Sequence, residues 1–469
     1  MPPGFYRLMR RWLLRYAKSA DGAAMLRRAA RSALKVAATA AAHSPAYRTL
    51  LAERGIAPGA IGRGAGLADL PVLTKESTFG RFSLDELARP LRTGEIADVL
   101  TSSGRGGNSF GYKLTTKTQH NRSWFDIDLG LQDMFDIDSM PTLVVNCLPM
   151  GVIFQSRATT IANLSVREDM ACSILRDIGP RFKQSLVCTD PLFIRQLLAQ
   201  GQISGVNWQT LNTSVILGEE VLVEAQRDFL AAEMGIALDA DTHRVIGSTY
   251  GMGELGLNLL FETRETIRMR RRQWRSANGR ANMSLHDSAT PNLFCFNPLR
   301  CYPEIVNPRP DGFGELVFTL LQPDAAIPLP RYSSGDLARL IPPEEARTWA
   351  ADAGTSAPWL PMLALHGRIK DRAGGQPSVE RVKEWLYTHH GIARQLTGAF
   401  RMQASTGGKT SITVQAASVV ETPRDILAAQ LLKLLDEPSR LAVDLSVESA
   451  DSFRWRPLLD FERKFSYAG

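Results

Sequence analysis

Short apolar runs alternate with helical patterns between about residues 96 and 340. Runs typical of buried strands lie at 96–100, 142–148, 185–188, 213–217 and 242–246. Between them, residues 168–178, 192–198 and 221–234 favour helices. This alternation predicts an α/β fold with substantial parallel sheet.

The pattern changes after a glycine-containing, polar stretch at 372–377. Beyond it we expect helices at 379–389 and 424–435, a hairpin turning at Gly407-Gly408, and a strand at 441–447. A hundred residues is enough for a compact small domain. We therefore predict a large N-terminal α/β domain with mixed sheets and helices at 44–369, followed by a small α+β domain at 370–469.

Residues 1–43 precede this domain as a basic helical segment. Its first helix carries one apolar stripe, formed by Phe5, Leu8, Met9, Trp12, Leu13 and Tyr16. Basic residues surround the stripe. Such a helix suits peripheral contact with an anionic membrane or a transit peptide, but packing of the stripe on the body of the protein gives the same pattern.

The composition is that of an ordinary globular protein, with 44% apolar and 22% charged residues among 469. Its net charge of +7 suits anionic ligands such as nucleotides, coenzyme phosphates or an acidic carrier protein. No nucleic-acid-binding motif accompanies the charge, so nucleic acid is not an expected partner. The basic run at 268–275 is interpreted as an exposed helix, with a docking surface for an acidic protein or coenzyme phosphates as the alternative.

The five cysteines have no paired disulfide spacing, and the odd count fits a reducing cytoplasm. His286, Cys295 and Cys301 could in principle hold zinc. Their spacing matches no tight ligand pattern, so core or loop cysteines are the simpler interpretation.

A stretch of small and hydroxylated residues follows the apolar run at 96–100. Residues 101–109 are Thr-Ser-Ser-Gly-Arg-Gly-Gly-Asn-Ser. Small residues let backbone N–H groups approach a polyphosphate, while hydroxyls and one arginine add donors and charge. The same composition is typical of a flexible surface connection. A phosphate loop is therefore indicated only if other segments supply the rest of a nucleotide site.

Such segments follow in order along the chain. They are Ser-Pro-Ala-Tyr at 44–47, Leu-Pro at 70–71, Thr-Lys at 74–75, Gly-Tyr at 111–112, Leu-Gly-Glu-Glu at 217–220, Tyr-Gly-Met-Gly-Glu at 250–254, Tyr-Pro-Glu-Ile at 302–305, Gly-Glu-Leu-Val-Phe-Thr at 314–319, Arg-Tyr-Ser-Ser-Gly-Asp-Leu at 331–337 and Gly-Arg at 367–368. Their order and spacing resemble the adenylate-forming superfamily, and within it the phenylacetate-CoA ligase-like branch. The resemblance runs from about residue 44 to the C-terminus.

The resemblance implies a site for ATP and Mg²⁺. Tyr250 would pack against adenine, Asp336 would accept hydrogen bonds from both ribose hydroxyls with Arg368 nearby, and Glu254 would hold Mg²⁺ beside the α-phosphate. The β- and γ-phosphates would contact Ser102, Ser103, Gly104 and Gly107. The adenine pocket would be lined by Gly218 and Glu219.

The same resemblance implies that residues 44–369 form a multi-layer adenylation domain and that the α+β C-terminal domain at 370–469 is a small mobile lid with a hinge. Lys464 is the candidate for the catalytic lysine that the lid brings to the α-phosphate, although a solvated terminal lysine is an equally simple interpretation. Lys370 and Asp371 would form the hinge. The acid pocket is expected at Met150, Phe154, Gly251 and Met252, where an apolar wall suits an aryl or acyl acid but is also typical of plain core.

Two features depart from the family pattern. Arg105 and Gly106 replace the usual threonines of the phosphate loop, so a fixed positive charge takes the place of hydroxyl donors and makes Arg105 a catalytic candidate. The hinge sequence at 372–376 is shortened and polar, where the family has an apolar stretch that shapes the pantetheine tunnel. This departure weakens the case for CoA as the acyl acceptor.

We therefore expect a cytoplasmic, ATP-dependent ligase that converts a small aryl or acyl carboxylic acid into an acyl-adenylate and pyrophosphate. The acyl group would then pass to a thiol, of CoA or an acyl-carrier protein, to a protein side chain, or to an amine. The alternative is a catalytically idle family member that binds a membrane or a protein through the N-terminal helix and the basic run at 268–275.

Overall fold

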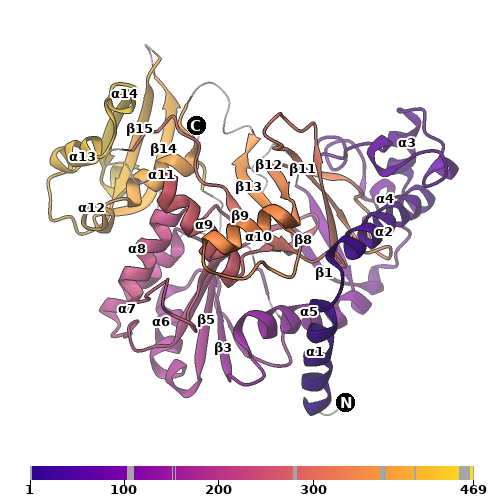
Figure 1. Ribbon diagram of the computed structural model, residues 1–469, viewed down its shortest axis with the longest axis horizontal. Helices are drawn as coiled ribbons and strands as arrows, with labels where there is room; N and C mark the ends of the chain where they lie inside the picture. The colour runs from indigo at the N-terminus through magenta and orange to yellow at the C-terminus, as the bar shows by residue number, and fades with distance from the viewer. Residues whose placement is uncertain are drawn as a thin grey trace.

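The structure is a computed structural model that describes residues 3–102, 110–149, 151–153, 155–277, 283–369, 376–405, 408–453 and 465–467. Figure 1 shows a large body, built from most of the chain, with a smaller C-terminal unit in yellow beside it. No helix in the described ranges is long and apolar enough to cross a membrane.

Helices form the N-terminal edge of the body. They are α1 (Pro3–Lys18), α2 (Gly22–His43), α3 (Pro45–Ala52) and the short α4 (Leu84–Leu87), with 3₁₀ turns at Pro58–Ala60, Leu67–Asp69 and Thr93–Glu95. The side chain of Asp21 accepts hydrogen bonds from the first backbone N–H groups of α2, and Ser44 caps α3 in the same way. Proline at the first position of α3 suits a helix start because its missing N–H needs no partner there.

A hairpin and one large mixed sheet follow. The hairpin strands are β1 (Ile96–Thr101) and β2 (Tyr112–Thr116). Eleven strands of the described chain form the large sheet in the order β10-β11-β12-β13-β9-β8-β7-β6-β5-β3-β4. These strands are β3 (Thr142–Asn146), β4 (Thr160–Asn163), β5 (Gln184–Thr189), β6 (Thr213–Leu217), β7 (Ile246–Met252), β8 (Gly256–Phe261), β9 (Asn292–Phe296), β10 (Cys301–Val306), β11 (Gly314–Leu320), β12 (Tyr332–Ile341) and β13 (Met362–Arg368).

Strands β3 to β7 pair in parallel, and β7 to β13 pair in antiparallel fashion. Helices pack around the sheet (Figure 1). They are α5 (Lys117–Phe135), α6 (Glu168–Asp177), α7 (Phe193–Ile203), α8 (Glu224–Met234), α9 (Arg264–Ala277) and α10 (Pro343–Asp352), with a 3₁₀ turn at Gly179–Arg181. Parallel strands buried on both faces need near-continuous apolar sequences, which β3, β5 and β6 have.

The C-terminal unit has its own three-stranded sheet, β14 (Leu396–Ala404), β15 (Thr410–Ala416) and β16 (Val443–Glu448), in the order β14-β15-β16. Its helices are α11 (Val379–Tyr387), α12 (His390–Arg394), α13 (Arg424–Lys433), α14 (Glu437–Leu441) and α15 (Ala450–Phe453). The expected hairpin is present, because β14 and β15 pair antiparallel and Gly408 has the positive φ that such turns favour.

The predicted α/β body and α+β C-terminal unit are confirmed. The strands expected at 142–148, 185–188 and 213–217 correspond to β3, β5 and β6. The prediction of a strand at 242–246 is wrong, because β7 begins only at Ile246. Asp241 accepts hydrogen bonds from the backbone N–H groups of His243 and Arg244, which turns the chain just before that strand.

The C-terminal unit shares a hydrophobic core with the body. One continuous cluster of buried side chains includes Phe193 and Leu230 of the body together with Trp385, Phe400 and Tyr467 of the C-terminal unit. Polar contacts reinforce this packing. Arg195 of α7, for example, donates to the backbone oxygens of Ala393 (2.7 Å) and Leu396.

The N-terminal helix is oriented differently from the simplest expectation. The prediction that its whole apolar stripe packs on the body is wrong, because four residues of the stripe are exposed. They are Phe5, Leu8, Trp12 and Tyr16. Arg10, by contrast, is buried and forms an ion pair with Asp138. Because Arg10 faces inward to form this ion pair, the large apolar side chains lie on the outer face of the helix.

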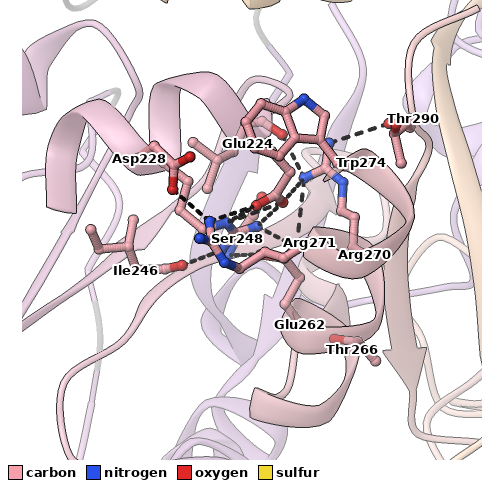
Figure 2. Close-up of polar contacts among 12 residues, drawn as sticks. Glu224, Asp228, Ile246, Ser248, Glu262, Thr266, Arg270, Arg271, Trp274 and Thr290 are labelled. Carbon is pink, nitrogen blue, oxygen red and sulfur yellow. Dashed lines mark hydrogen bonds and ion pairs between the residues drawn. The ribbon is translucent and has the colours of Figure 1, made fainter. Parts of the chain in front are cut away.

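The basic run at 268–275 is only in part the exposed helix expected from its charge, because Arg272 and Arg275 are exposed and other residues of the run are buried. It lies in α9, where Arg270 and Arg271 are buried against acidic partners (Figure 2). Arg270 forms an ion pair with Glu224 at 3.0 Å, and Arg271 pairs with Asp228 at 2.7 Å. The carboxylates that pair with the two buried arginines come from distant sequence positions, so the charge of the run alone could not show that part of it is internal.

The cysteines behave as core residues. Cys295 and Cys301 lie in β9 and β10 and are fully buried, and burial raises the pKa of both thiols. Within the described residues, no group of three or more His, Cys, Asp or Glu side chains is placed to hold a metal ion.

Candidate active site

A cavity of about 650 Å³ lies where the ends of β1, β6, β7, β12 and β13 meet the C-terminal unit. In open α/β sheets, ligands bind outside the carboxyl ends of parallel strands, and β6 and β7 end here. Most of the described candidate residues line this cavity. They are Ser102, Glu219, Tyr250, Gly251, Met252, Glu254, Asp336 and Arg368.

The base of the predicted phosphate loop is well defined. Ser102 donates its backbone N–H to the oxygen of Gly111 (2.8 Å), and its hydroxyl accepts from the backbone N–H of Gly111 (3.0 Å). Lys75 donates to the same hydroxyl at 3.0 Å. Residues 102 and 111 are therefore joined by two hydrogen bonds, and Ser102 and Lys75 line the cavity.

Lys75 reaches this position through a contact between distant segments. Leu73 donates its N–H to the backbone oxygen of Arg331 (2.9 Å), and Ser333 donates its N–H to Leu73 (2.7 Å). The segment that carries Lys75 is thereby aligned beside β12. The Thr-Lys motif at 74–75 is visible in the sequence, but the sequence assigns no role to the Lys75 side chain.

The turn between β7 and β8 approaches the phosphate loop closely. A Cβ atom at Gly253 would lie 2.6 Å from the Cα atom of Ser102, so only glycine fits there. Gly111 likewise leaves room for the side chain of Glu254. The two glycines thus allow the Glu254 carboxylate to sit against the base of the phosphate loop.

Glu254 is largely buried but faces the cavity. Burial, followed by the charge of Glu254, raises the pKa of the Tyr332 hydroxyl, and both side chains line the cavity. A single carboxylate next to a phosphate loop fits Mg²⁺, which is commonly held by one or two carboxylates together with substrate phosphates.

Tyr250, Asp336 and Arg368 lie together on the opposite wall. The Tyr250 hydroxyl donates to Asp336 Oδ2 at 2.6 Å. Asp336 and Arg368 are paired positions of neighbouring strands β12 and β13. Burial, followed by the charge of Asp336, raises the pKa of Tyr250, so its hydroxyl stays protonated at neutral pH.

The segment at 217–220 leaves the end of β6. Glu219 lies on the cavity with a left-handed backbone (φ 68°), and Glu220 donates its N–H to the oxygen of Gly218 at 2.8 Å. Gly218 itself is held by a bond from its N–H to Thr189 and is not among the lining residues. The structure therefore places Glu219 on the cavity and Gly218 just behind it.

The remaining candidates fall outside the described residues. They are Ser103, Gly104, Arg105, Gly107, Met150, Phe154, Lys370, Asp371 and Lys464. Near the predicted acid pocket, Val152, Leu100 and Leu257 line the cavity and give it an apolar wall.

The C-terminal unit contributes residues that the sequence did not indicate. Lys383 of α11 donates to Glu220 Oε2 at 2.7 Å, and the Tyr467 hydroxyl donates to the same oxygen at 2.6 Å. Both side chains line the cavity. The spacing of residues 220, 383 and 467 carries no local signal, because the cluster forms only when the C-terminal unit packs on the body.

A buried carboxyl lies behind this cluster. Asp190 accepts hydrogen bonds from the N–H groups of Leu192 (2.8 Å) and Phe193 (3.0 Å) through Oδ1. Its Oδ2 is buried without a hydrogen-bond partner in the described part of the chain. Burial, reinforced by the charge of Glu220, raises the pKa of Asp190 to about 7.

A buried ion network holds the strand that carries Tyr250. Glu262 accepts from the backbone N–H of Ser248 in β7 (2.8 Å) and pairs with Arg227 of α8 (2.7 Å), which also bonds the oxygen of Ile246 (Figure 2). Such a network fixes backbone position because each buried charge needs its partner. The network reaches the C-terminal unit as well, since Glu384 accepts from Glu224 N and Ala225 N at the start of α8 and from Trp274 Nε1.

Comparison with known proteins agrees with this geometry. No family model matches the chain. It is 26% identical over 338 residues to phenylacetate-coenzyme A ligase of Aromatoleum evansii, a match that covers 69% of this chain and 68% of that protein. In fold it is similar to 2-hydroxyisobutyryl-CoA ligase in the postadenylation state, with a TM-score of 0.66 and 13% identity over 97% of this chain and 91% of that one. An open conformation of the same ligase, in complex with 2-HIB-AMP and CoA, gives a TM-score of 0.55 with 15% identity, covering 95% of this chain and 91% of that one.

The chain therefore has the fold of the adenylate-forming enzymes. In sequence the chain is similar to a phenylacetate-coenzyme A ligase, in agreement with the resemblance found from its motifs.

Proposed function

We propose that the protein is an ATP-dependent ligase that activates a carboxylic acid as an acyl-adenylate, releases pyrophosphate and then transfers the acyl group to a thiol. The observation that carries this proposal is the meeting of Ser102, Glu254, Tyr250 and Asp336 around one cavity, although they come from separate parts of the chain. The sequence relationship to a phenylacetate-CoA ligase supports the same reaction class.

Each residue has a physical role in this proposal. Attack of a carboxylate on the α-phosphorus brings two anions together, so positioning and charge neutralisation supply most of the catalysis. The loop after Ser102, with Lys75 beside it, would hold the phosphates. Asp336 would accept from the ribose hydroxyls, and Tyr250 would offer its ring to adenine. When bound at Glu254, Mg²⁺ would supply screening of the phosphate charge.

The C-terminal unit would complete the site during adenylation. At the same coverage, the chain matches the ligase in its postadenylation state with a TM-score of 0.66 and in its thioesterification state with 0.54. This difference supports a lid arrangement suited to the first half-reaction. Lys464, which directly precedes the buried Phe465, is our candidate for the lid lysine, and rotation about Lys370 and Asp371 would bring the second half-reaction.

For the substrates we propose chemical classes, not individual compounds. Leu100, Val152 and Leu257, with Gly251 and Met252, favour an apolar acyl or aryl acid. CoA is the acceptor suggested by the relatives. The polar, shortened sequence at 372–376 keeps an acyl-carrier thiol, a protein side chain or an amine as competing acceptors.

Exchange of labelled pyrophosphate into ATP, measured across a panel of aryl, acyl and amino acids, tests the proposal. We expect exchange with at least one acid. Asp336→Ala and Glu254→Gln should each lower the exchange rate on the order of a hundredfold, because each removes a negative charge that positions ATP or its metal ion in the transition state. Asp311→Asn, an exposed change away from the cavity, is the matched control. Absence of exchange with every acid, together with absence of ATP binding in calorimetry, would favour the catalytically idle alternative.

The acceptor needs a separate measurement. Mass spectrometry of reactions supplied with CoA, a holo-carrier protein or hydroxylamine distinguishes the candidates. Rapid formation of a CoA thioester would show that the altered hinge sequence does not exclude CoA.

A further inference from the structure

Four large apolar side chains lie exposed on one face of α1. Their exposed fractions are 48% for Phe5, 70% for Leu8, 63% for Trp12 and 66% for Tyr16. The rings of Trp12 and Tyr16 stack with their centroids 5.7 Å apart. Single exposed apolar residues are normal on a protein surface, but a continuous stripe marks an interaction site.

The opposite face of α1 is anchored and fixes this orientation. Arg10 is buried between Asp128 (3.7 Å) and Asp138, and Lys18 pairs with Asp133 at 2.6 Å. Tyr6 packs edge-on against Trp124 of α5, with ring centroids 5.1 Å apart. Turning the stripe inward would break these ion pairs and take both arginine partners, Arg10 and Arg11, away from the buried Asp138 carboxylate, so the stripe faces outward in the folded chain.

Positive charge is concentrated in the same segment. Residues 1–43 contain nine arginine and lysine residues and one acidic residue, whereas the whole chain has a net charge of only +7. Arg7 and Arg15 of the same helix are also exposed. In α2, whose alanine face packs on the body, the outward side chains include Arg27, Arg28, Arg31 and Lys35. Both helices lie on the side of the molecule away from the C-terminal unit (Figure 1).

We propose that α1 docks the protein on an anionic lipid surface. Phe5, Leu8, Trp12 and Tyr16 would enter the boundary between headgroups and acyl chains, where aromatic rings are favoured. The flanking arginines would contact lipid phosphates. Charge complementarity selects this occupant, because a basic segment with exposed aromatic residues fits a negatively charged interface better than a second copy of the same positive surface.

Flotation of the full-length protein with vesicles tests this proposal. We expect binding to vesicles of phosphatidylcholine with 30% phosphatidylglycerol, weak binding to pure phosphatidylcholine, and loss of binding as salt is raised. Leu8→Gln with Trp12→Gln should lower vesicle affinity by about tenfold or more, because the buried apolar area is lost. Arg7→Gln and Arg15→Gln should each lower it by about fivefold.

The controls separate docking from folding. Ile203→Gln changes an apolar residue with an exposed fraction of 81% outside the N-terminal segment and should leave vesicle binding unchanged. All variants should keep the melting temperature of the wild-type protein. Trp12→Phe should preserve flotation but remove most of the blue shift in tryptophan emission on binding, although seven other tryptophans remain of the eight.

Three outcomes would overturn the proposal. One is that wild-type protein fails to float with anionic vesicles. Another is that it floats equally well after Leu8→Gln with Trp12→Gln. The third is a concentration-dependent dimer, measured by light scattering, that these substitutions abolish while no vesicle binding is detected, which would assign the stripe to a second copy.

Discussion

The hydroxyl of Tyr467 forms a contact between the end of the chain and the nucleotide-site segment at 217–220. It donates to Glu220 Oε2, the same oxygen that Lys383 contacts. Tyr467 also accepts the backbone N–H of Met402 at its own backbone oxygen (2.7 Å). Because Tyr467 lies three residues after Lys464, this anchor fixes one end of the segment that carries the candidate lid lysine.

Tyr467→Phe should therefore slow adenylation without unfolding the protein. Removal of a buried hydroxyl that bonds a carboxylate costs on the order of 2 kcal/mol, which predicts a pyrophosphate-exchange kcat lower by roughly tenfold or more. KM for ATP should change little if the anchor acts on the lid. Steady-state exchange kinetics measure both values.

Tyr387→Phe is the matched control for this prediction. Its hydroxyl also joins the C-terminal unit to the body, by accepting from Gln226 at 3.2 Å, but it does not line the cavity. Equal loss of kcat in both variants would mean that general attachment of the C-terminal unit, rather than the Tyr467 anchor, limits the reaction.

At the scale of elements, the turn between β7 and β8 lies against Ser102, the residue that leads into the predicted phosphate loop. Gly253→Ala would place a Cβ atom 2.6 Å from the Ser102 backbone and push the two segments apart. We expect ATP affinity, measured by calorimetry, to fall by at least tenfold, because small displacements of positioning groups are costly. Gly59→Ala, whose Cβ would meet open space, should bind ATP normally. Unchanged affinity in Gly253→Ala would show that the turn does not set the loop.

Elements with a strong local pattern could be predicted from the sequence, and contacts between distant segments could not. The apolar run of β6 and the helix around Glu224 were found because periodicity is a local property. Several residues that line the cavity, Glu254 and Asp336 among them, were singled out in the sequence because short motifs mark them. The inward position of Arg270 and the cluster of Lys383 and Tyr467 on Glu220 depend on tertiary packing, which a basic run or a lone lysine does not reveal.

At the scale of the whole molecule, the C-terminal unit and the parallel part of the sheet share one apolar core. Glu384 extends this attachment by capping the start of α8. The lid motion that we propose for the second half-reaction would have to separate these contacts. A change of pH can therefore alter the attachment by changing the protonation of the carboxyl groups buried at this junction.

Two of these carboxyls titrate near neutral pH. Burial raises the pKa of Glu384 to about 7. The charge of Arg270 acts to lower this pKa, and the charge of Glu224 acts to raise it. Asp190, which faces Glu220 and Glu219, also has its pKa raised by burial to about 7. In the unfolded chain both groups lose their protons near pH 4. The folded state thus holds more protons than the unfolded state between about pH 4 and 7.

It follows that the free energy of unfolding should fall as pH rises through this range and level off above about pH 8. Each group contributes a slope of up to about 1.4 kcal/mol per pH unit. Urea unfolding at pH 5, 6, 7 and 8 measures the slope. Asp190→Asn with Glu384→Gln should flatten it, whatever their effect on stability at a single pH, whereas Glu86→Gln, an exposed carboxyl change, should not. A double variant with the wild-type slope would mean that other groups titrate on unfolding and that the junction keeps its charge state across this range.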